Sequence, residues 1–234
     1  YSAGVRHLVL PVESGSAKVL KEQMRKPLKL DFSIRVANDC RDLGIYTNSN
    51  VMIGMPGETK EDIEETRRNL KKIKTNWFNI ACASPLVGSE MYEIAKNNNF
   101  IDDVTRGADY HFAVINTDDW DSDYIQQTQY LLNLELNFVE NNDLALGEFE
   151  LALKGFNNVI KVRYDHAFAH YFAAICHLNL KNEESYNRHK SLVRKYGKND
   201  FWRKFFDQFN LNLNLPDYHA ENNFNWQKAS SLCC

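Results

Sequence analysis

Three short polar segments hold the residues best suited to binding a small molecule: residues 13–16, 54–58 and 84–89. Each contains at least one glycine, and a glycine lets a ligand approach the backbone closely. Glu13 adds a carboxylate, which accepts hydrogen bonds from a hydroxyl or an amino group. These residue types indicate a binding site for a polar ligand, and they identify no catalytic residue.

Each polar segment follows a short apolar run. We predict buried strands at residues 7–12, near 50–53 and at 77–83. The first run is continuously apolar, which favours a strand covered on both faces, with Pro11 at its end or at a bulge. Helices are expected at 17–24, at 31–43 and from Thr59 to about residue 73. This alternation predicts right-handed βαβ units, in which functional loops lie at the carboxyl ends of the strands.

The rest of the chain has the pattern of successive helices. We expect them at about 122–140, 144–163, 166–180, 183–196 and 200–209, with an acidic run at 118–123 as the first helix start. Short connections favour antiparallel neighbours, and residues 146–196 resemble a tetratricopeptide-type repeat of roughly 34 residues. The expected fold class is α/β plus all-α. Its expected parts are residues 1–117, 118–209 and an irregular tail at 210–234.

Three motifs in the α/β part carry a resemblance to a known family. Residues 13–26 (ESGSAKVLKEQMRK) resemble the fourth-strand segment of radical S-adenosylmethionine (SAM) enzymes. Residues 52–59 (MIGMPGET) resemble the fifth-strand motif, and residues 84–92 (SPLVGSEMY) resemble the proline–glycine loop after the sixth strand. The resemblance covers residues 5–97, about 40% of the chain. It is strongest to the cobalamin-associated group that includes anaerobic magnesium-protoporphyrin IX monomethyl ester oxidative cyclase.

The resemblance implies a SAM site formed by these loops. It implies that Glu13 and Ser14 contact the cofactor. Gly54, Pro56 and Gly57 would then form the wall near its adenine. The reaction implied is radical-based C–H chemistry on a small-molecule substrate.

Other interpretations of the same residues stay open. Glu13 is also compatible with a solvated loop carboxylate, and the glycine turn with a plain strand-to-helix connection. Glu58 could cap the helix that follows it. For the loop of residues 85–88 the structural interpretation is preferred, because proline and glycine are typical turn residues.

The cysteines lack the pattern that the family's metal cluster requires. The family holds a [4Fe–4S] cluster through cysteines spaced C-x3-C-x2-C, because thiolates are the ligands that such clusters accept. The cysteines lie at positions 40, 82, 176, 233 and 234, which do not give that spacing. We therefore expect the C-terminal half of a (β/α) barrel, with the cluster-binding half before Tyr1 and no catalysis by this chain alone. Bound cobalamin is a further expectation from the resemblance.

Composition and charge limit the partners that we expect. The net charge is −3, from 28 basic and 31 acidic residues, so there is no basic excess for a nucleic-acid backbone. No apolar run approaches the roughly 18–20 residues that span a bilayer. An odd number of irregularly spaced cysteines favours a reduced, cytoplasmic chain. For His166, His170 and His177, helix-interface packing is preferred to a metal site, so no metal ligand is predicted. Lipidation of Cys233 and Cys234 lacks a supporting motif.

Two functional hypotheses therefore remain. In the first, the chain contributes loops that position SAM and substrate in a radical SAM enzyme. In the second, the tetratricopeptide-like helices bind a peptide or protein partner, and the α/β part is a non-catalytic scaffold.

Overall fold

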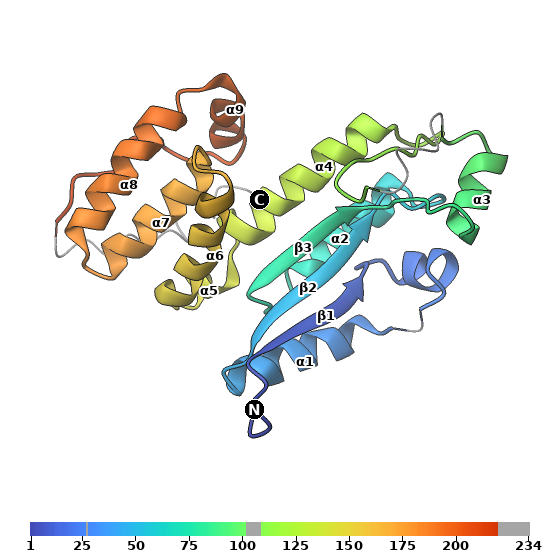
Figure 1. The fold of residues 1–234 in the computed structure, drawn as a ribbon, viewed down its shortest axis with the longest axis horizontal. Helices are drawn as coiled ribbons and strands as arrows, with labels where there is room; N and C mark the ends of the chain where they lie inside the picture. The colour runs from blue at the N-terminus through green and yellow to red at the C-terminus, as the bar shows by residue number, and fades with distance from the viewer. Residues whose placement is uncertain (27, 102–108, 220–234) are drawn as a thin grey trace. The chain divides into compact units, whose positions relative to one another are not determined.

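The computed structural model describes residues 1–26, 28–101 and 109–219. The chain divides into two compact units, Tyr1–Leu136 and Asn137–Cys234. The first unit contains the sheet and the second is helical (Figure 1). The expected combination of an α/β part with a helical part is therefore confirmed.

The first unit contains a three-stranded parallel sheet in the order β1-β2-β3. Its strands are β1 (His7–Glu13), β2 (Tyr46–Ile53) and β3 (Trp77–Cys82). The register pairs Leu10 with Ser49 and Ile53 with Cys82. The arrowheads of all three strands point the same way in Figure 1. The predicted strands and their parallel arrangement are confirmed.

Alternating side chains give the sheet one apolar and one more polar face. On β2, Val51 and Ile53 are buried, Met52 between them is partly buried, and Asn50, which precedes Val51, is exposed. The buried face packs with residues of α1 (Leu30–Asp42) and α2 (Lys60–Leu70), including Ala37 and Ile63. Helix α4 (Ser122–Leu134) packs against β3. The sheet face opposite the buried one carries the exposed side chains of Asn50 and Asn79.

The prediction that β1 is covered on both faces is wrong. Leu8 is 38% exposed and Val9 is 50% exposed. Among the described residues β1 is an edge strand, so its continuous apolar run is not matched by packing on both sides. The prediction for Pro11 is confirmed, because the pairing with β2 shifts between Pro11 and Glu13 as at a β-bulge.

Several helix boundaries differ from the prediction. The segment expected as a helix at 17–24 is a π-helical turn, η1 (Val19–Gln23). The helix expected at 122–140 is α4 followed by a π-helical turn, η3 (Glu135–Val139). Asp121 caps α4, because its carboxylate accepts a hydrogen bond from the Tyr124 N–H at 2.7 Å.

The helix expected at 144–163 is divided into α5 (Asn142–Ala145) and α6 (Phe149–Val162). The division falls at Gly147, whose φ of 75° a right-handed helix does not accommodate. Helix α3 (Glu90–Asn97) in the first unit follows the third polar segment.

The second unit continues with α7 (Ala167–Asn179), α8 (Glu183–Tyr196) and α9 (Asp200–Gln208). Helix α7 packs against both α6 and α8, and nearly all of its residues are buried. The resemblance to a tetratricopeptide repeat stays a prediction. The compact units divide after Leu136, later than the expected boundary at residue 117, because α4 packs on the sheet.

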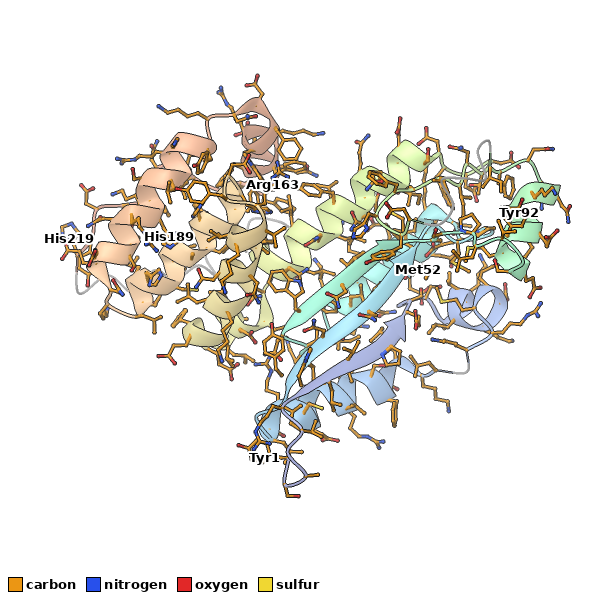
Figure 2. The ribbon with its side chains drawn as sticks, in the orientation of Figure 1. Tyr1, Met52, Tyr92, Arg163, His189 and His219 are labelled. Carbon is orange, nitrogen blue, oxygen red and sulfur yellow. The ribbon has the colours of Figure 1, made fainter. Side chains whose placement is uncertain are left out.

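His166 and His170 of the second unit have hydrogen-bond partners, whereas the Nδ1 of His177 and the Nε2 of His189 are buried without one among the described residues. The Nδ1 atom of His166 accepts a hydrogen bond from the Ala169 N–H and caps α7. His170 bonds instead to His189 of α8, which Figure 2 labels, with 3.0 Å between their Nδ1 atoms. In the described part of the chain, no group of three His, Cys, Asp or Glu residues is arranged to hold a metal. Cys233 and Cys234 lie outside the described residues. None of the described helices has the length and apolar character needed to cross a membrane.

Candidate functional site

The three polar segments begin at the same edge of the sheet. Strands β1, β2 and β3 are parallel, Glu13 pairs with Val51, and Ile53 pairs with Cys82. Residues 13–16, 54–58 and 84–89 therefore follow their strands at the carboxyl edge. Met52, labelled in Figure 2, lies close to this edge. The structure brings Glu13, Gly54 and Pro85 to one end of the sheet, as the βαβ pattern predicts.

Glu13 occupies a bulge at the end of β1 and has a φ of 65°. A left-handed conformation costs a residue with a Cβ about 1–2 kcal/mol. Such conformations persist where the surroundings enforce them, often at functional sites. The carboxylate of Glu13 lies 2.5 Å from the Lys26 Nζ and is partly exposed. Glu13 is thus a strained, accessible carboxylate at the mouth of the sheet.

Ser14 lies beside Glu13 but is fully buried. Its Oγ is 3.0 Å from the Thr66 Oγ1 and accepts a hydrogen bond from the Ser16 N–H. At Gly15, a Cβ would lie 2.7 Å from the Thr66 Cα, so only glycine allows this approach to α2. The hydroxyl of Ser14 therefore anchors the segment to α2, and its implied contact with a cofactor stays a prediction.

Asp62 of α2 fixes the same segment. Its carboxylate accepts hydrogen bonds from Ser16 at 3.1 Å and from the Lys18 Nζ at 2.9 Å. It also accepts one from the Thr59 N–H at 2.9 Å, which closes a capping box at the start of α2. Burial alone would raise the pKa of Asp62, but these hydrogen bonds lower it to about 2. The ionised carboxylate of Asp62 therefore holds the segment of residues 13–16 against the N-terminus of α2.

Gly54 opens the second segment with a φ of 85°. A Cβ at this residue would lie 2.8 Å from the Cγ2 of Ile125 on α4. Both the backbone conformation and the neighbouring helix therefore favour glycine. Pro56 is buried and Gly57 is exposed, so the turn presents backbone rather than large side chains.

Glu58 closes this turn from inside the protein. Its Oε2 accepts hydrogen bonds from the Gly54 N–H at 2.6 Å and the Met55 N–H at 3.0 Å. Its backbone oxygen accepts a hydrogen bond from the Trp120 indole at 2.7 Å. The other carboxylate oxygen, Oε1, is buried with no hydrogen-bond partner among the described residues. Thr59 caps α2, so Glu58 holds the loop together instead of capping the helix.

Burial raises the pKa of Glu58 to about 7, against the opposing effect of the Met55 and Gly54 N–H groups. The side chain is 1% exposed by residue area, so water does not stabilise its charged form. Sequence reasoning did not identify this arrangement. The signal that could have found it is a carboxylate four residues after a glycine in a tight turn.

The third segment is more exposed than the other two. Pro85 is buried, but Val87 at the tip is 73% exposed. Ser89 then caps α3 by accepting a hydrogen bond from the Tyr92 N–H at 3.2 Å. Within the described residues this segment forms a turn, and it offers Leu86 and Val87 as apolar surface.

A cleft of about 860 Å³ lies on the open face of the sheet, within the first unit. Its lining includes Glu13 at the end of β1, Asn50 and Met52 of β2, Asn79 of β3 and Tyr130 of α4. Of the five predicted site residues, only Glu13 lines this cleft; Ser14, Gly54, Pro56 and Gly57 do not. The cleft was not anticipated, because its walls come from segments far apart in the sequence.

The described cysteines do not fit a [4Fe–4S] cluster. Cys40, Cys82 and Cys176 are buried and free, and they lie on separate elements. Burial raises the pKa of the Cys82 thiol to about 11, whereas cluster ligands are thiolates. The described residues therefore supply three neighbouring loops and a cleft, but no cysteine ligands for a [4Fe–4S] cluster.

Part of the first unit is similar to a known family. Residues 2–70 match the family model described as the radical SAM superfamily. The chain is 30% identical over 144 residues to cytidylyl-2-hydroxyethylphosphonate methyltransferase of Streptomyces wedmorensis, an alignment that covers 58% of this chain and 27% of the relative. It is 33% identical over 95 residues to tRNA-2-methylthio-N(6)-dimethylallyladenosine synthase of Thermosipho melanesiensis, covering 40% of this chain and 22% of the relative. The chain thus spans about a quarter of the length of the curated relatives that it matches.

Proposed function

We propose that the first unit forms part of the SAM-binding site of a radical SAM enzyme and orients the cofactor and substrate. The observation that carries the proposal is the meeting of three loops at the carboxyl edge of a parallel sheet, beside an open cleft. Two of these loops, residues 13–16 and 54–58, lie within the segment that matches the superfamily. SAM with a [4Fe–4S] cluster supplies radical chemistry in this superfamily. The described residues contribute binding and orientation only.

In this proposal Glu13 accepts a hydrogen bond from a ribose hydroxyl or an amino group of SAM. Its carboxylate is accessible, and the ion pair with Lys26 aligns it. Gly57 offers exposed backbone to the adenosyl group beside the Gln23 side chain, whereas Gly54 and Pro56 are buried and set the shape of this wall. Ser14 contributes indirectly, because its hydroxyl fixes the segment to α2.

The substrate in this proposal is a small molecule. The relatives are named for a phosphonate substrate and for adenosine in tRNA, so both kinds of substrate occur among proteins similar to this one. The net charge of −3 favours the small molecule, because binding of a tRNA backbone needs a basic surface. Cobalamin stays a prediction from the resemblance, and a cytoplasmic location stays a prediction from the number and spacing of the cysteines. No observation in the second unit favours the alternative of a peptide partner.

The test is a titration of the chain with SAM by calorimetry, comparing wild type with Glu13→Ala. Loss of a hydrogen bond to a charged group costs about 1.5–3 kcal/mol, so we expect Kd to rise roughly 10- to 100-fold. Asp42→Ala is the matched control, because Asp42 is an exposed carboxylate at the end of α1, before β2 begins. Equal affinity of Glu13→Ala and wild type would remove the assignment of Glu13.

A further inference from the structure

The cleft on the open sheet face is lined by carboxamides and aromatic rings. Its carboxamides are Asn50, Asn79, Gln126, Gln129 and Asn133. None of the described residues that line it is a lysine or an arginine, and the one histidine, His111, has its Nδ1 atom 2.8 Å from the Asp109 carboxylate. Its one carboxylate, Glu13, is paired with Lys26 outside the lining at 2.5 Å. An anionic ligand placed there would lose water without gaining an opposite charge, which is costly.

Helix α4 forms one wall with a single polar stripe. Gln126, Gln129, Tyr130 and Asn133 are spaced so that they lie on one face of the helix. The other face carries Ile125, which is buried in the core.

Hydrogen bonds hold this wall in place. The Gln129 Nε2 donates to the Ile80 oxygen at 2.6 Å. Gln126 accepts from the Ala113 N–H at 3.0 Å and donates to the His111 oxygen at 3.1 Å. These bonds fix the loop that carries Tyr110 into the cleft lining. The wall is therefore pre-organised, which lowers the entropy cost of binding.

The floor of the cleft carries a paired set of carboxamides. Asn50 and Asn79 are register partners on β2 and β3, and the Asn79 Nδ2 donates to the Asn50 Oδ1 at 2.9 Å. Both residues are exposed, and the described residues offer no further partner to the Asn50 amide group or to the Asn79 carbonyl. One donor and one acceptor thus face the cleft next to each other. A ligand edge with an acceptor beside a donor complements them.

We propose that this cleft binds an uncharged, planar ligand whose edge carries a hydrogen-bond acceptor beside a donor, as in the lactam edge of a nucleobase. Asn50 and Asn79 are its specificity-determining residues, and Trp77 and Tyr110 offer aromatic surface for the plane of the ligand. The identification of this cleft as the substrate site of a SAM enzyme rests on the proposed function. The ligand chemistry follows from the lining alone.

The test uses uridine as the probe and the Trp fluorescence of the full chain as the readout. Uridine is expected to bind at least about tenfold more tightly than 3-methyluridine, which lacks the N–H donor, and than uridine 5′-monophosphate, which adds charge. Asn50→Ala and Asn79→Ala should each weaken uridine binding about fivefold or more. Asn38→Ala, on the exposed surface of α1, is the control and should bind uridine like wild type.

Measuring uridine binding in the presence of saturating SAM distinguishes binding in the cleft from binding in the SAM site. Uridine affinity should be retained with SAM present, and it is measurable without SAM even if the proposed function fails. The proposal is overturned if uridine does not bind, if the monophosphate binds as tightly, if both Asn variants bind like wild type, or if SAM displaces the probe.

Discussion

Replacing Glu58 with alanine is expected to lower the free energy of unfolding by about 2–4 kcal/mol at pH 5. The substitution removes the acceptor of two backbone N–H groups, those of Gly54 and Met55, in a buried turn. It also leaves a cavity where a side chain with 1% residue exposure had packed. Glu58→Gln should retain most of the stability at this pH, because an amide oxygen accepts the same two hydrogen bonds.

The pH dependence of this effect has a defined direction. The Glu58 carboxyl titrates near 4.5 in an unperturbed environment and near 7 in the folded protein, because burial disfavours its charge. The folded state therefore holds this proton to a higher pH than the unfolded chain. Its contribution to stability is complete below about pH 4.5 and declines as the pH rises to about 7. The decline is on the order of 3 kcal/mol.

Urea unfolding of wild type, Glu58→Ala and Glu58→Gln at pH 5 and pH 8 checks both statements. The stability of wild type relative to Glu58→Gln should fall between the two values, because Gln does not titrate. Glu61→Gln, which changes an exposed carboxylate in the first turn of α2, is the control and should show no such change. A difference between wild type and Glu58→Gln that is the same at both pH values would contradict a buried, titrating Glu58.

Gly54→Ala is expected to destabilise the protein by about 2–4 kcal/mol and to abolish measurable SAM binding. Two costs combine at this residue. The φ of 85° is unfavourable for alanine, and the new Cβ would lie 2.8 Å from the Ile125 Cγ2. To relieve the contact, the loop has to move away from α4, which changes the wall of the proposed adenosyl site.

Gly88→Ala separates the two costs, because Gly88 has a φ of 87° and nothing within 4 Å of a Cβ. It should lose only the backbone contribution, about 1–2 kcal/mol. The double variant Gly54→Ala/Ile125→Ala should lose at least about 1 kcal/mol less unfolding free energy than the two single variants lose together, because the Ile125 Cγ2 that opposes the new Cβ is absent. Additive losses, or equal losses at Gly54 and Gly88, would show that α4 does not constrain the loop. Thermal and urea unfolding give these values.

The strand pattern was sufficient to predict where the polar loops meet. Apolar runs ending at Glu13, Gly54 and Ser84 predicted parallel strands, and parallel strands bring their carboxyl ends to one edge. The same pattern could not show that Ser14 is buried, because its partner Thr66 lies 52 residues away on α2. It also overestimated the burial of β1, since a continuous apolar run does not distinguish an edge strand from a central one.

Long-range partners explain the features that were missed. Glu58 binds backbone groups of its own turn, but the residue that covers it, Trp120, is 62 residues away. The cleft joins Asn50, Asn79 and α4, and only the register places the two asparagines opposite each other. The polar residues of α4 recur at a helical period that was not used for the prediction, and their position over the sheet depends on the fold. Gly147 was the local signal for the break between α5 and α6.

Hydrogen–deuterium exchange of the chain with and without SAM locates the bound cofactor along the chain, so it shows whether the three loops form one SAM site. We expect slower exchange in all three sets of peptides, those that contain residues 13–16, 54–58 and 84–89, and no change in α6 to α8 of the second unit. Protection of only one of these segments, or protection confined to other parts of the chain, would contradict a SAM site formed jointly by the three loops.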